Sequence, residues 1–233
     1  YVHQFYTRRS LHVLAALRKR AMASHFPREI SFLINSYDLT HSTLMSRVIF
    51  KGGGKKPVLT GYQSGTLYVS SLPVEKNLIE GLRKQKLGVI VESLQHIRSA
   101  QFVSTGSAAN LDIPDDSVDY IFIDPPFGGN IMYSELNFLS ESWLGVHTNN
   151  KLEAIENKIQ DKDITNYRAL MTSAFTEAFR VLKPGRWMTV EFSNTQASVW
   201  NSIQTALQEA GFVVANVSAL DKKQGSFKAV TTT

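Results

Sequence analysis

The chain contains no cysteine among its 233 residues. This absence excludes a disulfide framework, a thiolate zinc site and a cysteine nucleophile. The six histidines show no spacing typical of metal ligands, so we expect no metal site. No stretch approaches the ~18 uninterrupted apolar residues that a membrane span needs. We therefore expect a cytoplasmic protein without a membrane partner.

The composition also excludes several broad classes. Hydrophobic residues make up 43% of the sequence, which is too many for a disordered or fibrous chain. The length fits one large domain, or one domain with an appendage. The first residue is Tyr1 rather than methionine, and we expect this chain to be a piece of a longer one.

Charges of the two signs are unevenly spread along the chain. Residues 1–99 carry 15 Lys and Arg against 5 Asp and Glu, a net charge of +10, and residues 100–233 carry 10 against 15, a net of −5. The difference suggests a basic region that contacts nucleic acid, 1–99, and a catalytic region, 100–233. Alternatively, the basic side chains are simply solvated. The candidate phosphate contacts are Arg8, Arg9, Arg18, Lys19, Arg20, Lys55 and Lys56.

The basic half has short and mixed secondary-structure patterns. Apolar residues at helical spacing predict a helix over 7–23. We also expect strands at 30–34 and 66–71 and a helix over 74–85, while 44–50 and 89–94 fit either type. The Gly-rich stretch 51–57 is a loop, interpreted either as a basic hairpin tip on a phosphate backbone or as an exposed flexible loop.

The second half alternates strands with helices more regularly. The expected strands are 102–104, 118–123, 187–192 and 212–220, and the expected helices are 133–144, 165–182 and 198–210. Such alternation predicts βαβ units and an α/β fold with a mainly parallel sheet. The dense apolar run 118–123 suits a strand that is covered on both faces. The three tryptophans are interpreted as core residues.

The clearest chemical motif follows the run 118–123. Asp124 ends the expected strand, and Pro125, Pro126 and Phe127 come directly after it. In open α/β sheets, ligands bind at this end of the strands. The prolines lack N–H donors, so their carbonyls remain acceptors beside the Asp124 carboxylate. Two acceptors next to a flat aromatic ring match an exocyclic amine on a planar base.

These residues resemble the D/N/S-P-P-Y/F/W signature of the nucleic-acid amino-methyltransferases. Asp124 to Phe127 match it position by position, and the wider phrase from Ile113 through Leu136 is similar to a bacterial subgroup of DNA methylases. The stretch Arg180 to Gly185 is similar to the segment before the fifth strand of class I methyltransferases. The resemblance implies a Rossmann-type sheet with a basic N-terminal appendage, incomplete if the chain is a piece.

The resemblance also implies a reaction and a set of roles. The family transfers a methyl group from S-adenosylmethionine to the exocyclic amine of adenine or cytosine in DNA, and we expect adenine here. Hydrogen bonds to Asp124 and the Pro125 carbonyl would position the amine, and Phe127 would stack on a base flipped out of the duplex. The lack of cysteine argues against methylation of a cytosine ring carbon.

The cofactor part of the family pattern is the main departure. No Gly-rich turn of the expected kind is found, so the chain alone would bind S-adenosylmethionine poorly if its cofactor half lies elsewhere. Ser107 is either a cofactor contact or part of an ordinary turn. Glu191 and Asn194 end the next strand on its ligand-facing edge and are interpreted as solvated polar side chains rather than ligand contacts, and Asn130 is interpreted as a helix cap. Tyr133, Ser134 and Glu135 are candidates for the pocket wall.

Two alternative functions stay open. The first is methylation of an RNA base or of a protein glutamine amide, which related N-P-P-Y proteins perform. The second is a non-catalytic nucleic-acid-binding module that has lost the cofactor loop. The sequence does not indicate a recognition site or an oligomeric state.

Overall fold

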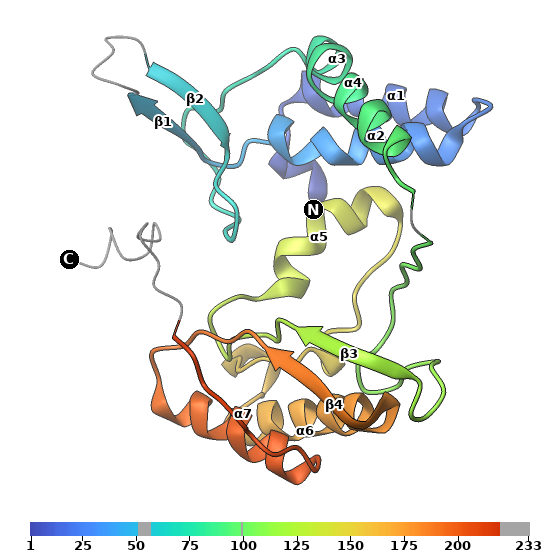
Figure 1. Ribbon diagram of the computed structural model, residues 1–233. Helices are drawn as coiled ribbons and strands as arrows, with labels where there is room; N and C mark the ends of the chain where they lie inside the picture. The colour runs from blue at the N-terminus through green and yellow to red at the C-terminus, as the bar shows by residue number, and fades with distance from the viewer. Residues whose placement is uncertain (51–56, 99, 220–233) are drawn as a thin grey trace. The chain divides into compact units, whose positions relative to one another are not determined.

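The computed structural model describes residues 1–50, 57–98 and 100–219, which form two compact units (Figure 1). The first unit comprises Tyr1–Thr105 and Ile131–Glu153. The second comprises Gly106–Asn130 and the chain from Ala154 onwards. The first boundary lies near the one expected at residue 99, but the segment Ile131–Glu153 packs with the first unit rather than with the second.

The first unit is mainly helical. Helix α1 begins after Thr7, whose hydroxyl accepts a hydrogen bond from the backbone N–H of Ser10. Helix α2 begins at Pro27, which suits a first helical position because its ring sets a helical φ and it has no N–H to leave unpaired. The helices are η1 (Val2–Phe5), α1 (Arg8–Met22), α2 (Pro27–Asp38), η2 (Leu39–His41), α3 (Leu78–Gly81), the π-helical η3 (Leu82–Leu87), α4 (Gly88–Gln95), α5 (Tyr133–Leu144) and η4 (Asn150–Leu152).

The core of the first unit joins its two chain segments. Leu14 of α1, Ile34 of α2 and Leu139 of α5 are almost fully buried in one cluster. Trp143 of α5 donates its indole N–H to the Tyr6 hydroxyl at 3.0 Å, with the two rings edge to face. Helix α5 therefore belongs to this core, and its bounds confirm the helix predicted over 133–144.

An antiparallel hairpin completes the first unit. Strand β1 (Ser46–Phe50) pairs with β2 (Pro57–Tyr62), so that Phe50 lies opposite Pro57. Beyond the hairpin, an isolated bridge joins Leu44 to Val69. The predicted loop 51–57 and its Lys55 and Lys56 lie outside the described residues, apart from Pro57.

The second unit is a small α/β arrangement. Strand β3 (Val118–Ile123) pairs in parallel with β4 (Leu182–Val190), and α6 (Ile164–Val181) precedes β4 directly. Asp163 and Asn166 form a capping box at the start of α6. Helix α7 (Ala197–Glu209) packs against α6, and η5 (Lys158–Gln160) completes the unit. The predicted α/β class with parallel pairing is confirmed for β3, α6 and β4, whereas the strands expected at 102–104 and in the described part of 212–220 are not formed.

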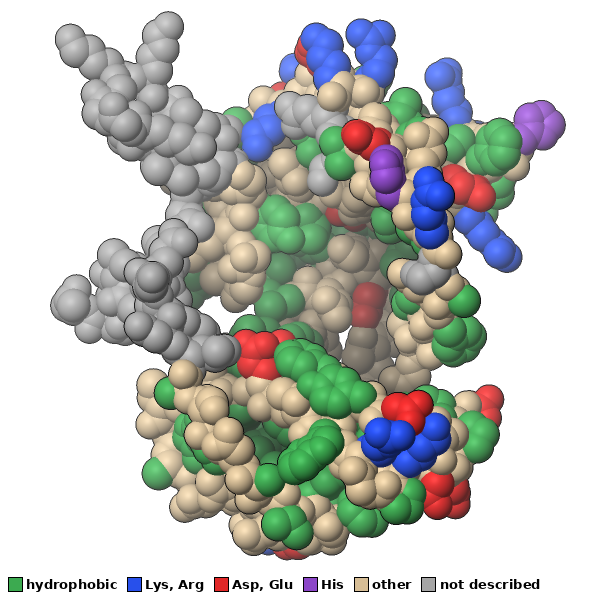
Figure 2. Space-filling view, viewed as in Figure 1, with side chains coloured by type: hydrophobic (Ala, Val, Ile, Leu, Met, Phe, Trp, Pro, Cys, Tyr) green, Lys and Arg blue, Asp and Glu red, His purple; other side chains and the backbone are tan. Residues whose placement is uncertain are grey.

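Only one face of the β3–β4 sheet is covered. Helices α6 and α7 lie on that face, where Ile123 packs against their core (Figure 1). The opposite face carries Tyr120, Phe122 and Trp187, which are 54%, 58% and 65% exposed. Hydrophobic side chains accordingly gather on the outward surface of this unit (Figure 2). The expectations that 118–123 is covered on both faces and that Trp187 is a core residue are therefore wrong.

Several predicted elements differ from the structure. The segment 30–34 belongs to α2, because a short apolar run fits a helix or a strand equally well and Pro27 starts a helix. The segment 89–94, which fits either type in the sequence, is helical and lies in α3–α4, a continuous helical stretch that starts at Leu78 after its cap Asn77. The segments 102–104 and 212–219 contain no strand. The strand expected at 66–71 is reduced to the isolated bridge from Val69 to Leu44.

Every described helix is too short or too polar to cross a bilayer. Within the first unit, the most deeply buried charged group is Asp38, at the end of α2. Its side chain is 1% exposed, Oδ1 accepts from the Leu39 N–H at 2.5 Å, and Oδ2 has no hydrogen-bond partner among the described residues. Burial raises the pKa of Asp38 to about 6, although the Leu39 N–H and Arg18 partly oppose this.

The buried Asp38 predicts a stability that depends on pH. Because its pKa is higher in the folded state than in the unfolded state, the contribution of Asp38 to the free energy of unfolding is fully present below about pH 4 and is lost as pH rises through about 6. Asp38→Asn keeps the shape of the side chain and removes its ionisable carboxyl group. The free energy of unfolding of the wild type should therefore fall relative to that of the variant, by about 3 kcal/mol between about pH 4 and pH 7.

Urea unfolding of both proteins across this range measures the difference. The pKa of the neighbouring His41 is lowered by burial, which favours the opposite trend, but His41 is present in both proteins and its effect cancels. Parallel pH profiles of the two proteins would contradict the prediction.

Candidate functional site

The D-P-P-F segment lies at the carboxyl end of β3. Its position is set by the parallel pairing, since the Glu191 N–H donates to the Ile123 carbonyl at 2.9 Å where the two strands end. Asp124 is exposed, Pro125 is buried and Phe127 is half-buried. The sequence predicts this placement of Asp124 at the end of a strand.

The three carbonyls of the segment differ in their partners. The Tyr167 hydroxyl donates to the Pro126 carbonyl at 2.6 Å, and Asn194 Nδ2 donates to the Phe127 carbonyl at 2.9 Å. Among the described residues, nothing donates to the Pro125 carbonyl or to the Asp124 carboxylate. Two acceptors in consecutive residues thus have no donor among the described residues, one on the exposed Asp124 and one on the buried Pro125.

Asn194 is held in place by its own contacts. Its Oδ1 accepts from the Gln196 N–H at 2.7 Å, and its carbonyl accepts from the Trp200 indole N–H at 2.8 Å. The interpretation of Asn194 as a solvated polar side chain missed its role in supporting the loop. The available signal was its place after β4, which matches the place of Asp124 after β3.

An aromatic cluster supports the Phe127 ring. Phe127 and Phe192 meet edge to face, with centroids 5.3 Å apart, and Phe192 meets Trp200 in the same way at 4.9 Å. Such pairs hold ring orientation as well as burying area. The Phe127 ring is therefore held in a fixed orientation, two residues after Pro125 in the same loop.

The loop then turns sharply at Gly128. Its φ is +65°, and a Cβ there would lie 3.0 Å from Glu156 Oε1 and 3.1 Å from a Val199 methyl. Gly129 likewise lies against the Glu156 backbone carbonyl. No motif in the sequence marks Glu156 as a neighbour of this loop.

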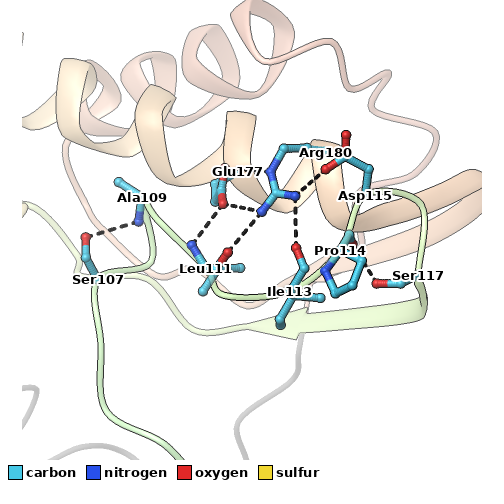
Figure 3. Close-up of polar contacts among 9 residues, drawn as sticks. All are labelled: Ser107, Ala109, Leu111, Ile113, Pro114, Asp115, Ser117, Glu177 and Arg180. Carbon is cyan, nitrogen blue, oxygen red and sulfur yellow. Dashed lines mark hydrogen bonds and ion pairs between the residues drawn. The ribbon is translucent and has the colours of Figure 1, made fainter.

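The segment before β3 is held by Arg180, near the end of α6 (Figure 3). Its guanidinium donates to the carbonyls of Leu111 and Ile113 at 3.0 and 2.9 Å and pairs with Asp115 and Glu177. The hydrogen bond from Arg180 lowers the pKa of Glu177 to about 2. Arg180 thus has a structural role, which supports the entry into β3.

Ser107 lies in a turn at the start of this segment (Figure 3). Its hydroxyl accepts from the Ala109 N–H at 3.3 Å and its carbonyl accepts from the Asn110 N–H at 3.1 Å. The residues shortly before Ser107, 102–104, form no strand, contrary to the expectation. The cofactor contact stays a prediction, and the described contacts of Ser107 are those of a turn.

Residues 133–135 belong to the first unit, where they begin α5. The Glu153 carboxylate accepts from the N–H and the hydroxyl of Ser134 at 2.9 and 2.6 Å. Asn130 does not cap this helix, because Met132 occupies the cap position. The pocket role of Tyr133, Ser134 and Glu135 stays a prediction.

The basic side chains of α1 are not equivalent. Arg8, Lys19 and Arg20 are exposed, and Arg9 pairs with Glu75 at 3.1 Å. Arg18 is half-buried and donates to Asn35 at 3.4 Å. Arg18 therefore has a structural contact, whereas the exposed cations are free to meet phosphates.

Among the described residues, no three His, Asp or Glu side chains gather in a way that would hold a metal ion. The loop geometry instead yields a prediction at Gly128. Gly128→Ala should lower the free energy of unfolding by about 1–2 kcal/mol for the left-handed φ, and by a further ~1–3 kcal/mol for crowding against Glu156 and Val199.

Gly185→Ala is the matched control for this prediction. Gly185 belongs to the same unit and has a φ of +73°, but nothing lies within 4 Å of its Cβ position. Urea unfolding of both variants separates the backbone effect from the crowding. Equal losses of stability would show that the loop tolerates the added methyl group.

Comparison with known proteins does not place the chain in a family. No protein-family model, curated protein or solved structure matches it. A functional conclusion therefore depends on the residues and contacts of the site itself.

Proposed function

We propose that the chain is the target-base part of a DNA amino-methyltransferase, with a class I methyltransferase-type sheet. In this proposal, a methyl group passes from S-adenosylmethionine to the exocyclic amine of a base, with adenine favoured over cytosine. The observation that carries the proposal is the pair of available acceptors, the Asp124 carboxylate and the Pro125 carbonyl, beside the Phe127 ring. The four matching residues of the D-P-P-F signature support it.

The acceptor pair suits an amine nucleophile. The lone pair of an exocyclic amine is delocalised into its ring, so the amine reacts poorly in a planar state. Hydrogen bonds from the –NH₂ group to Asp124 and Pro125 would favour a pyramidal nitrogen with its lone pair directed at the methyl donor. The half-buried Phe127 would stack on the flipped base.

The methyl donor itself has no complete site among the described residues. Outside the loop 124–130, no described strand leads into a helix through a Gly-rich turn that would hold the donor. This observation favours a second candidate function, a nucleic-acid-binding module without catalysis. Equilibrium binding of S-adenosylmethionine to the chain would distinguish the two candidates, since a module without catalysis would not bind the donor.

Substitution of Asp124 tests the proposal. Asp124→Ala should lower methyl transfer on the order of 100-fold or more, because one acceptor of the amine is lost, and leave the fold intact. Transfer of labelled methyl to DNA, RNA and protein is measured in parallel with the full-length protein. Asp112→Ala, which removes another exposed carboxylate of the same unit, is the control. Full methyl transfer by the Asp124→Ala variant would refute the role assigned to Asp124. Transfer of label to RNA alone or to protein alone would identify that molecule as the substrate in place of DNA.

The exposed cations of α1 predict salt-dependent DNA binding. Arg8 and Lys19 lie eleven residues apart, and therefore on the same side of the helix. Arg8→Gln and Lys19→Gln should each reduce the slope of log K against log salt by about 1, without changing sequence preference. Arg18→Gln is the contrast, since Arg18 contacts Asn35. Unchanged slopes in the first two variants would place the phosphate contacts elsewhere.

A further inference from the structure

We propose that Tyr167 and Asn194 are positioning residues, which hold the D-P-P-F loop so that the Pro125 carbonyl faces the target amine. The inference rests on the proposed function. It assigns roles to one residue of a helix and one of a distant loop, neither of which belongs to the signature.

The backbone of the loop has few rotations left. The rings of Pro125 and Pro126 fix φ at both residues. A following proline also restricts the residue before it to the extended region, which limits ψ at Asp124 and Pro125. Of the four ψ rotations, those at Pro126 and Phe127 remain, and each of them turns the carbonyl of its own residue.

Those two carbonyls are the ones that Tyr167 and Asn194 bind. The Tyr167 hydroxyl holds the Pro126 carbonyl at 2.6 Å, and Asn194 Nδ2 holds the Phe127 carbonyl at 2.9 Å. Each ψ rotation from Asp124 to Phe127 is thereby restrained, either by a following proline or by a hydrogen bond. The Pro125 carbonyl keeps one direction and is left for the ligand.

Tyr167 is a rigid anchor because of where its ring lies. The side chain is 0% exposed and packs in the core with Met171, Phe175 and Val199. Its backbone N–H donates to Asp163, the cap of α6, at 3.0 Å. The hydroxyl oxygen is therefore held by the α6–α7 core, and the loop is held by the hydroxyl.

Asn194 anchors the loop from a different element. It follows β4, and its contacts with Gln196 and Trp200 fix its side-chain oxygen and its carbonyl. The amide nitrogen is left to face Phe127. Loss of either anchor would release one rotation of the loop, which should slow the chemical step more than it weakens substrate binding.

Tyr167→Phe is the main test, because it removes the hydroxyl and keeps the buried ring. In the full-length protein, kcat should fall about 10- to 100-fold, with KM for DNA unchanged, since small misplacements of reacting groups carry costs of this size. Tyr120→Phe is the matched control. It removes another hydroxyl of the same unit, which donates to Thr189 at 2.6 Å on the open face of the sheet, and should leave kcat unchanged.

A second measurement does not depend on activity. Pro126–Phe127 is the only Pro-Phe pair in the sequence, and Phe127–Gly128 is the only Phe-Gly pair. Labelling with ¹³C-carbonyl proline and ¹⁵N-phenylalanine, or with ¹³C-carbonyl phenylalanine and ¹⁵N-glycine, therefore yields one NMR signal for each carbonyl. Tyr167→Phe should shift the Pro126 carbonyl signal, and Asn194→Ala the Phe127 signal.

The two measurements separate failure of the inference from failure of the proposed function. If the wild type transfers methyl groups, an unchanged kcat or an unmoved Pro126 signal in Tyr167→Phe overturns the inference. A rise in KM with kcat unchanged also overturns it. If the wild type transfers nothing, the proposed function fails, and the carbonyl signals alone decide whether the two residues hold the loop.

Discussion

The parallel pairing of β3 with β4 is the constraint on which the candidate site depends. Because the strands run in the same direction, their register brings Ile123 opposite Val190 and their carboxyl ends to one edge. The loops after the two strands therefore leave the sheet side by side. This is why Asn194, which follows β4, reaches the Phe127 carbonyl, which follows β3.

The α6–α7 core gives this edge its rigidity. Tyr167 and Phe175 are fully buried between the two helices and the covered face of the sheet, and the Tyr167 hydroxyl extends the core to the D-P-P-F loop. The other face of the same sheet carries exposed aromatic side chains. The loop is thus supported by the side of the unit whose helices follow it in the sequence.

Part of this arrangement was predictable from local patterns. The bounds of β3 and α5 agree with the predicted ranges. The apolar run of β3 and the helical pattern of α5 each extend over the whole element and end at clear turn residues. The short run 30–34 was misassigned, since five apolar and small residues fit either period. The strand expected at 66–71 is reduced to the bridge between Val69 and Leu44, and the described part of 212–220 forms no strand, because a strand needs a partner, which its own sequence does not specify.

The sequence by itself determined that Asp124 to Phe127 follow a strand and that prolines limit the loop, because both follow from residue types and their order. It did not determine which carbonyls stay available. That depends on Tyr167 and Asn194, which lie 41 and 67 residues from their partners and reach them only when α6 and β4 pack against β3. Hydrogen bonds over such separations arise from tertiary structure, so only the fold decides which acceptors a ligand meets.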